Sequence, residues 1–159
     1  MKKLTALLTS FILLQFASSN ILAQARIPLV VAPARQTVAL DAGKTENLQI
    51  KFFNESISPI SGNLKAVDFI VTNSDGSPTL LEDQVNDWVK LPYNRASIPS
   101  GDVLRVNFKV EVPNDAPAGG RYVAIIFEQT GQLSQGSDNE SQSLVAPRIV
   151  GLLNIRVNG

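Results

Sequence analysis

The segment Leu104-Arg105-Val106-Asn107-Phe108-Lys109-Val110-Glu111-Val112 decides the fold of this chain. Apolar side chains occupy every second position, and charged or amide side chains occupy the positions between them. A strict period of two is typical of a β-strand with one face on a core and one face in water. A helix would need apolar residues at a period of ~3.6, so the segment predicts a half-buried strand over 104–112.

Shorter segments on both sides continue the pattern. Leu48, Ile50 and Phe52 share one parity, and turn-forming groups such as Asp41-Ala42-Gly43 separate the apolar runs. The region 63–72 has apolar residues on both parities, which predicts a bulge or a two-sided strand. We expect further strands over 36–40, 47–53, 63–72, 79–81, 122–127 and 145–157. Residues 88–91 form a short apolar segment, and 96–98 are expected to pair nearby. A single helical turn within 80–89 is the one alternative.

Both parities of 122–127 are apolar, which predicts a central strand covered on both faces. Short strands at roughly ten-residue spacing favour an all-β fold, and the length suits an immunoglobulin-like antiparallel β-sandwich of seven to eight strands with no disulfide. Trp88 and Tyr122 are the largest core candidates. Tyr122, which begins its strand, is expected to donate its hydroxyl to the backbone as a tyrosine corner.

The composition excludes several reaction mechanisms and metal sites. The 159 residues include no cysteine and no histidine, so Ser-His-Asp and Cys-His mechanisms have no base and thiolate or imidazole metal sites have no ligands. The 14 basic and 14 acidic residues give no net charge. A nucleic-acid partner calls for a clustered basic surface, and we expect none. We also expect no cofactor.

The N-terminus has the pattern of an export signal. Lys2 and Lys3 precede an apolar run over 4–16, and Ala23-Gln24-Ala25 provides a small-residue cleavage site. We therefore expect a cleaved signal peptide over 1–25 and a single domain over 26–159, exported to the periplasm, the cell surface or the extracellular space. An uncleaved anchor is the alternative, although the apolar run is shorter than the ~20 residues of a membrane span. After cleavage we expect no integral membrane span. Loss of Lys2 and Lys3 leaves 12 basic against 14 acidic residues.

Side chains with oxygen ligands, mostly acidic ones, are the candidates for catalysis or metal binding. Glu82, Asp83 and Asp87 lie before Trp88, as a glycan hydrolase with two carboxylates and an aromatic platform would require. A solvated acidic loop beside a core tryptophan is the interpretation that we favour, and no enzyme is expected. Oxygen ligands suited to calcium occur in turn-like segments, where ordinary turns are the preferred interpretation: Asp75, Asp138, Asn139 and Glu140.

A partner-binding surface is the better prediction. Edge strands of a sandwich carry unpaired backbone groups to which a partner strand can add. The last strand places Val145, Ile149 and Leu153 in phase and suits such addition, although an ordinary core strand has the same pattern. The loops over 113–120 and 132–143 are further candidates, the second being rich in Gln, Ser and Asn and predicted as a mobile hairpin tip.

Several phrases also carry a family resemblance. They are Ala32-Pro33-Ala34-Arg35, Leu40-Asp41-Ala42-Gly43, Phe53-Asn54, Trp88-Val89-Lys90-Leu91, Ile98-Pro99-Ser100-Gly101, the stretch from Val112-Pro113 to Arg121-Tyr122, and Arg148-Ile149-Val150-Gly151. Together they resemble the N-terminal Ig-like, peptidoglycan-binding domain of bacterial WxL-interacting cell-surface proteins. More loosely, they are similar to the first domain of periplasmic pilus chaperones, in which a basic pair holds the C-terminal carboxylate of a subunit. That likeness implies a partner-binding role for Arg35.

The resemblance implies an exported, non-catalytic module of the bacterial cell envelope that binds a surface protein or peptidoglycan. The alternative is a periplasmic chaperone-like protein that acts by β-strand complementation during assembly of pili or other surface structures. The partner-binding candidates are Arg35, Val145, Ile149 and Leu153. The oligomeric state stays open.

Overall fold

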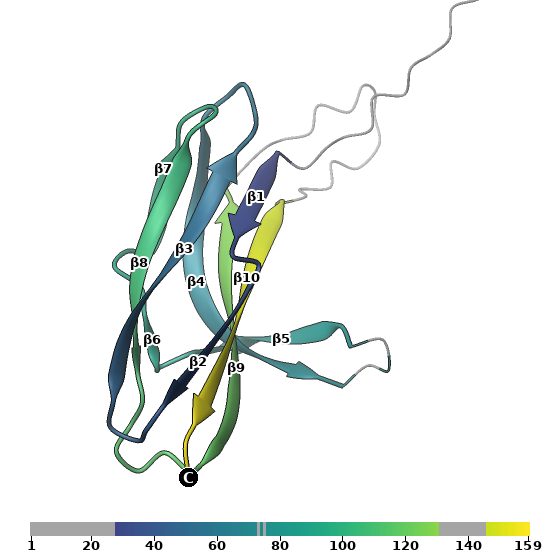
Figure 1. Ribbon diagram of the computed structural model, residues 1–159. Coiled ribbons are helices and arrows are strands. Elements are labelled where there is room, and N and C mark those ends of the chain that lie inside the picture. The colour runs from purple at the N-terminus through teal and green to yellow at the C-terminus, as the bar shows by residue number, and fades with distance from the viewer. Residues whose placement is uncertain (1–27, 73, 75, 131–145) are drawn as a thin grey trace, which may run out of the picture.

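The computed structural model describes residues 28–72, 74, 76–130 and 146–159. Two sheets face each other as a β-sandwich (Figure 1). One sheet has the order β1-β3-β8-β6, and the other has the order β2-β10-β9-β4-β5 with β7 also paired to β4. The strands are β1 (Leu29–Ala32), β2 (Arg35–Leu40), β3 (Thr45–Asn54), β4 (Ile60–Val71), β5 (Pro78–Val85), β6 (Val89–Lys90), β7 (Arg95–Ile98), β8 (Val103–Glu111), β9 (Gly119–Gln129) and β10 (Arg148–Val157).

The predicted Ig-like sandwich is confirmed, with ten strands in the described residues rather than seven or eight. The alternation that decides the fold is visible in β8, where Val106, Phe108 and Val110 are buried and the residues between them are exposed. These side chains meet the inward face of the second sheet. At the centre the rings of Phe52 and Phe127 lie 5.6 Å apart between centroids. No disulfide joins the two layers, because the chain has no cysteine. Apolar packing joins them, together with hydrogen bonds such as that from the Asn54 amide in β3 to the Ile98 carbonyl in β7 at 3.0 Å.

β9 is the central strand of the larger sheet and is covered on both faces, as its sequence predicts. Its odd positions face the main core, whereas Ala124 and Ile126 belong to a second cluster on the outer face with Val67 and Phe69. Part of that cover comes from the β4–β5 arm, the hairpin formed by the end of β4 and by β5, which runs out from the side of the sandwich (Figure 1). Leu80 in the arm packs on the outer cluster.

The first described segment of the chain contributes to both sheets. β1 pairs with β3 in the smaller sheet, and after the cis peptide Ala32-Pro33 the chain continues as β2, which pairs in parallel with β10. The sequence pattern does not predict β1, because four consecutive apolar residues show no alternation. The change of sheet decides which part of β10 has a neighbour on its outer side.

Two local expectations are wrong. The first concerns residues 80–85, which are strand rather than a helical turn, so β5 is longer than the predicted 79–81, and Glu82 and Asp83 lie in a strand instead of a loop. Of the two short apolar segments, β6 joins β8 in one sheet and β7 joins β4 in the other. The described part of the last strand begins at Arg148, and Val145 lies outside the described residues.

The second error concerns Tyr122. Trp88 is buried as expected, but Tyr122 is 45% exposed and lies on the outer face, where its ring contacts Phe69 at 5.5 Å between centroids. Its hydroxyl makes no hydrogen bond with a described residue, so there is no tyrosine corner. Both parities of this strand are apolar, and the alternation alone therefore assigned Tyr122 to the wrong face.

Candidate functional site

The first half of β10 has a free side, which we call the open edge (residues 148–151). β9 flanks the whole of β10, but β2 pairs only from Leu152 onward, where the Leu152 N–H donates to the Ala34 carbonyl at 2.9 Å. Before Leu152 no described strand pairs with β10 on the β2 side, although β1 lies close to this part of β10 (Figure 1). The open edge is therefore an unpaired strand segment within an otherwise paired sheet.

The hydrogen-bond pattern shows which groups are unpaired. The Gln129 N–H donates to the Pro147 carbonyl at 2.9 Å, so the odd positions of β10 face β9 in the antiparallel ladder. The backbone N–H and C=O of Arg148 and Val150 consequently face away from β9. No described group bonds to them, and this leaves two donors and two acceptors available to an incoming strand.

β1 forms the opposite side of the same rim. It pairs with β3 alone among the described strands, so its outer edge is also free. Gly151 brings the two sheets into contact here, because a Cβ at this position would collide with the Ile50 side chain and would meet Val31 Cγ2 at 3.3 Å. The rim thus has two strand edges, one from each sheet, above a closely packed floor.

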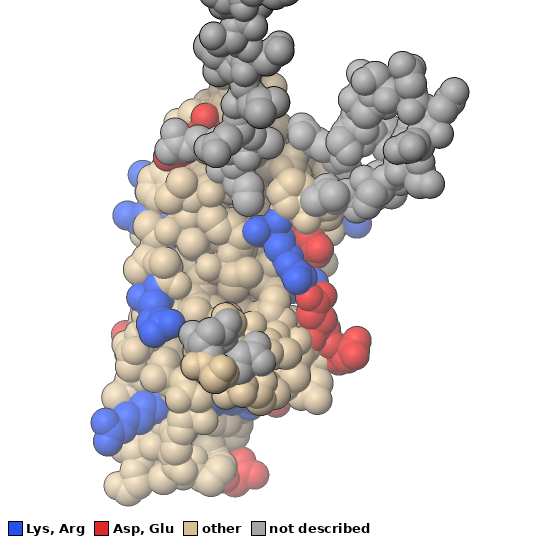
Figure 2. All heavy atoms as spheres, turned by 90° about the vertical axis from the view of Figure 1, so that its right-hand side faces the viewer, with Lys and Arg blue, Asp and Glu red and all other residues tan. Residues whose placement is uncertain are grey.

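Ion pairs connect the β4–β5 arm to the open edge. Arg148 donates to the carboxylate of Glu82 in β5, and Lys65 Nζ lies 3.4 Å from Glu82 and 3.3 Å from Glu128. Basic and acidic side chains lie next to each other on this side of the molecule (Figure 2). The hydrogen bond from Arg148, followed by the positive charge of Lys65, lowers the pKa of Glu82 from its ordinary value of 4.5. Glu82 therefore serves as an ion-pair partner rather than as a free acid.

Asp87 is also engaged in an ion pair, whereas Asp83 is exposed in β5. Arg121 binds Asp68 through two nitrogens, at 2.8 and 3.3 Å, and its guanidinium lies 3.0 Å from Asp87. The same guanidinium lies 4.5 Å above the Trp88 ring, an arrangement typical of a cation–π contact. This network fixes the crossing from β5 to β6, so the Trp88 region is structural.

Metal binding finds no support in the described part of the chain. There, no group of three or more acidic side chains is arranged to hold an ion. Asp75, Asp138, Asn139 and Glu140 lie outside the described residues.

Three of the four predicted partner-binding residues lie near the rim. Arg35 begins β2, exposed and opposite Leu152, immediately beyond the open edge. Ile149 is half-buried within the open edge, whereas Leu153 is 1% exposed and supports the rim from the core. Val145 lies outside the described residues. The rim itself was not predicted, because alternation does not reveal where β2 stops pairing with β10.

No protein-family model and no curated protein matches this chain. Solved structures do match, at low sequence identity. A PapD-like domain of human CEP192 aligns with a TM-score of 0.57 and 9% identity, covering 89% of this chain and 95% of that one. The class 5 fimbriae chaperone CfaA aligns at 0.55 and 11%, covering 82% and 57% of the two chains. A complex of the Salmonella enterica SafA pilin with the SafB chaperone aligns at 0.54 and 10%, covering 82% and 54%.

These likenesses define the class of fold: a PapD-like, Ig-like β-sandwich. They agree with the looser resemblance to pilus chaperones and not with the resemblance to WxL-interacting proteins. The chain spans a little over half the length of the fimbrial chaperones it matches. The described residues contain no helix of the length and apolarity that crossing a membrane requires.

Proposed function

We propose that this chain is an exported, chaperone-like module of the bacterial cell envelope that binds a protein partner by β-strand complementation. The open edge is the observation that carries this proposal. Unpaired edges attract further strands, and proteins usually protect or use them. Main-chain hydrogen bonds would supply affinity, and side-chain contacts would supply selectivity.

A strand added at the open edge would extend the larger sheet. It would bond to the outward backbone groups of Arg148 and Val150, and its inward side chains would pack near Ile149 and Val31. Arg35, at the end of the open edge, offers a positive charge to an acidic group of the partner. The neighbours among fimbrial chaperones support this proposal, one of them in a complex with a pilin.

The same proposal assigns residues 1–25 to a cleaved signal peptide and 26–159 to the binding domain. The periplasm is the compartment that fits this assignment best, because the neighbours include a periplasmic chaperone. Peptidoglycan binding, the other function expected from the sequence, has no structural observation in its favour. It enters as a competing outcome of the experiment below.

The test uses the full chain, purified after export, and an envelope protein extract. We expect the full chain to retain a polypeptide from the extract that is released only by denaturant. In that complex the amides of Arg148 and Val150 should gain protection from hydrogen exchange. V150P removes an N–H from the open edge without affecting the ladder to β9, and it should abolish retention. T37P is the matched control, because Thr37 lies on the outer edge of β2 and its N–H also faces away from β10.

Strand addition at the open edge would be refuted if V150P and T37P lost retention of the partner equally. It would also be refuted if the complex formed without new protection of the Arg148 and Val150 amides. Retention of the chain on purified peptidoglycan in place of a protein would instead support the wall-polymer function.

A further inference from the structure

The outer face of the larger sheet is hollowed between β2 and the β4–β5 arm. The cavity there has a volume of about 550 Å³, and we call it the outer groove. β2, β10 and β9 form its floor, because Leu152 packs on the outer cluster and residues opposite each other in neighbouring strands project to the same face. The arm, which runs out from the side of the sandwich, forms one wall (Figure 1).

The β2 end of the outer groove is polar and cationic. Arg35 lies there opposite Leu152, and Thr37 lies opposite Asn154. Arg35 is exposed, and it is the one charged side chain among the described residues that line the outer groove. Neither its guanidinium nor the Asn154 amide makes a hydrogen bond or ion pair with a described residue. A guanidinium binds a carboxylate through two parallel hydrogen bonds, so this end favours an acidic group of a ligand.

The arm end of the outer groove is apolar. The Tyr122 ring is 45% exposed and lies 5.5 Å from the Phe69 ring between centroids. Val71, two positions beyond Phe69 in β4, is 51% exposed. An apolar group that covers these side chains removes them from water, which favours binding. The remaining lining positions add no outward side chain, because Gly76 has none and Leu153 belongs to the core.

We propose that the outer groove binds an extended segment of a protein partner that has an acidic residue and a large apolar residue two positions apart. Side chains two positions apart in such a segment lie on the same face, roughly 6.8 Å from each other. Arg35 and Tyr122 lie two strand spacings apart, ~10 Å across the sheet, and the long arginine side chain covers the remaining distance. The carboxylate accepts from the Arg35 guanidinium, and the apolar side chain packs on Tyr122 and Val71.

The separation of charge and apolar surface favours a peptide over an acidic sugar as the occupant. A sugar ring has hydroxyl groups around its whole edge, and those at the arm end would lose water without gaining a partner. The outer groove lies on the face of the sheet rather than at a strand edge. Binding there therefore does not depend on strand addition at the open edge.

The first test is a titration of the full chain with the blocked tripeptide acetyl-Glu-Ser-Phe-amide, followed by backbone amide NMR. We expect saturable shifts at the amides of Tyr122 and Asn154. The dissociation constant should be on the order of 1 mM, because one exposed ion pair and one apolar side chain contribute. Acetyl-Gln-Ser-Phe-amide should bind about three- to fivefold more weakly, and high salt should reduce this difference. Acetyl-Glu-Ser-Ala-amide should bind about tenfold more weakly, since it lacks the aromatic side chain.

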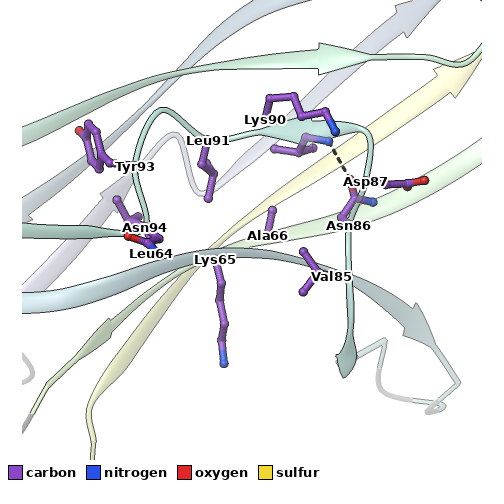
Figure 3. Close-up of a pocket in the computed structure, with 11 residues that line it drawn as sticks. Leu64, Lys65, Ala66, Val85, Asn86, Asp87, Lys90, Leu91, Tyr93 and Asn94 are labelled. Carbon is purple, nitrogen blue, oxygen red and sulfur yellow. Dashed lines mark hydrogen bonds between the residues drawn. The ribbon is translucent and has the colours of Figure 1, made fainter.

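Matched variants test each end of the outer groove. R35Q should weaken binding of the glutamate peptide about three- to fivefold and leave binding of the glutamine peptide unchanged. R105Q is its control, because Arg105 is exposed on the other sheet. Y122A should weaken binding about five- to tenfold. Y93A is its control, because Tyr93 is 38% exposed but lines a separate cavity between β4 and the segment 85–94 (Figure 3).

Several results would overturn the proposal. One is an absence of saturable shifts at Tyr122 and Asn154 up to the solubility limit of the peptide. Others are equal affinities for the glutamate and glutamine peptides, or equal weakening in the variants and their controls. Saturable binding of glucuronate but not of the peptide would assign the outer groove to acidic sugars instead. V150P should bind the peptide as the unmodified chain does, and loss of binding in V150P would place the peptide at the open edge.

Discussion

Gly151 is the position where packing between the sheets is most sensitive to one added carbon. In G151A the new Cβ would collide with the Cδ1 atom of Ile50, which is itself 1% exposed and cannot move into solvent. Overpacking of this kind typically costs about 1–3 kcal/mol of unfolding free energy. We expect G151A to lose an amount within that range.

The colliding atom can be removed by a second change. I50V deletes only Cδ1, and alone it should cost about 1 kcal/mol. The next atom outside Ile50 is Val31 Cγ2 at 3.3 Å from the built Cβ, a contact that shifts of a few tenths of an ångström relieve. In the I50V background, G151A should therefore be neutral or stabilising by up to about 1 kcal/mol, because alanine lowers the entropy of the unfolded chain. The two changes should couple by about 1–3 kcal/mol.

Urea unfolding of the four proteins of this double-mutant cycle, followed by fluorescence of the single Trp88, measures the coupling. Additivity within about 0.5 kcal/mol would refute the reasoning, since it would mean that the side chains at 50 and 151 do not meet. As a control, I155V changes another fully buried isoleucine and should add to G151A without coupling.

Three further predictions follow from other residues. N54A should cost about 2–3 kcal/mol in urea unfolding, because the buried Asn54 amide donates to the carbonyls of Ser58, Ile98 and Pro99 and its loss deprives the buried Ile98 carbonyl of this donor; a cost below about 0.5 kcal/mol would contradict this. The lowered pKa of Glu82 means that its ion pairs stabilise the fold above pH 4.5 and are lost as the pH falls through the folded-state pKa. R148Q should move the pKa of Glu82 back toward 4.5, as measured from its carboxyl NMR shifts. An unchanged pKa would show that Arg148 is not the main cause of the lowering. Y122F should change the unfolding free energy by less than about 0.5 kcal/mol, because the Tyr122 hydroxyl has no described partner. A larger loss would indicate that the hydroxyl makes the hydrogen bond of a tyrosine corner.

The parts of the fold that depend on local alternation were predictable. β8 and β9 follow directly from the side chains of 104–112 and 122–127, because period-two patterning is a property of each strand alone. The bulge expected in 63–72 is present as a register shift between Val67 and Phe69. The assignment of Trp88 to the core follows from its size and its apolar neighbours.

The candidate site could not be predicted in the same way. The open edge exists because β2 begins to pair only at Leu152. This feature depends on register between segments far apart in sequence, and residue type does not encode register where both faces are apolar. Arg35 and Ile149 were identified as candidates, but nothing in the sequence placed them at one rim.

The parallel pairing of β2 with β10 has a mechanical consequence. The two strands run in the same direction over six residue pairs, one near each end of the described chain. A force that pulls the N-terminal side of β2 away from the C-terminal end of β10 therefore loads all rungs of this ladder in shear. β1 is a shorter strand and pairs with β3 in the other sheet. The same force can therefore separate β1 from β3 while the pairing of β2 with β10 stays intact.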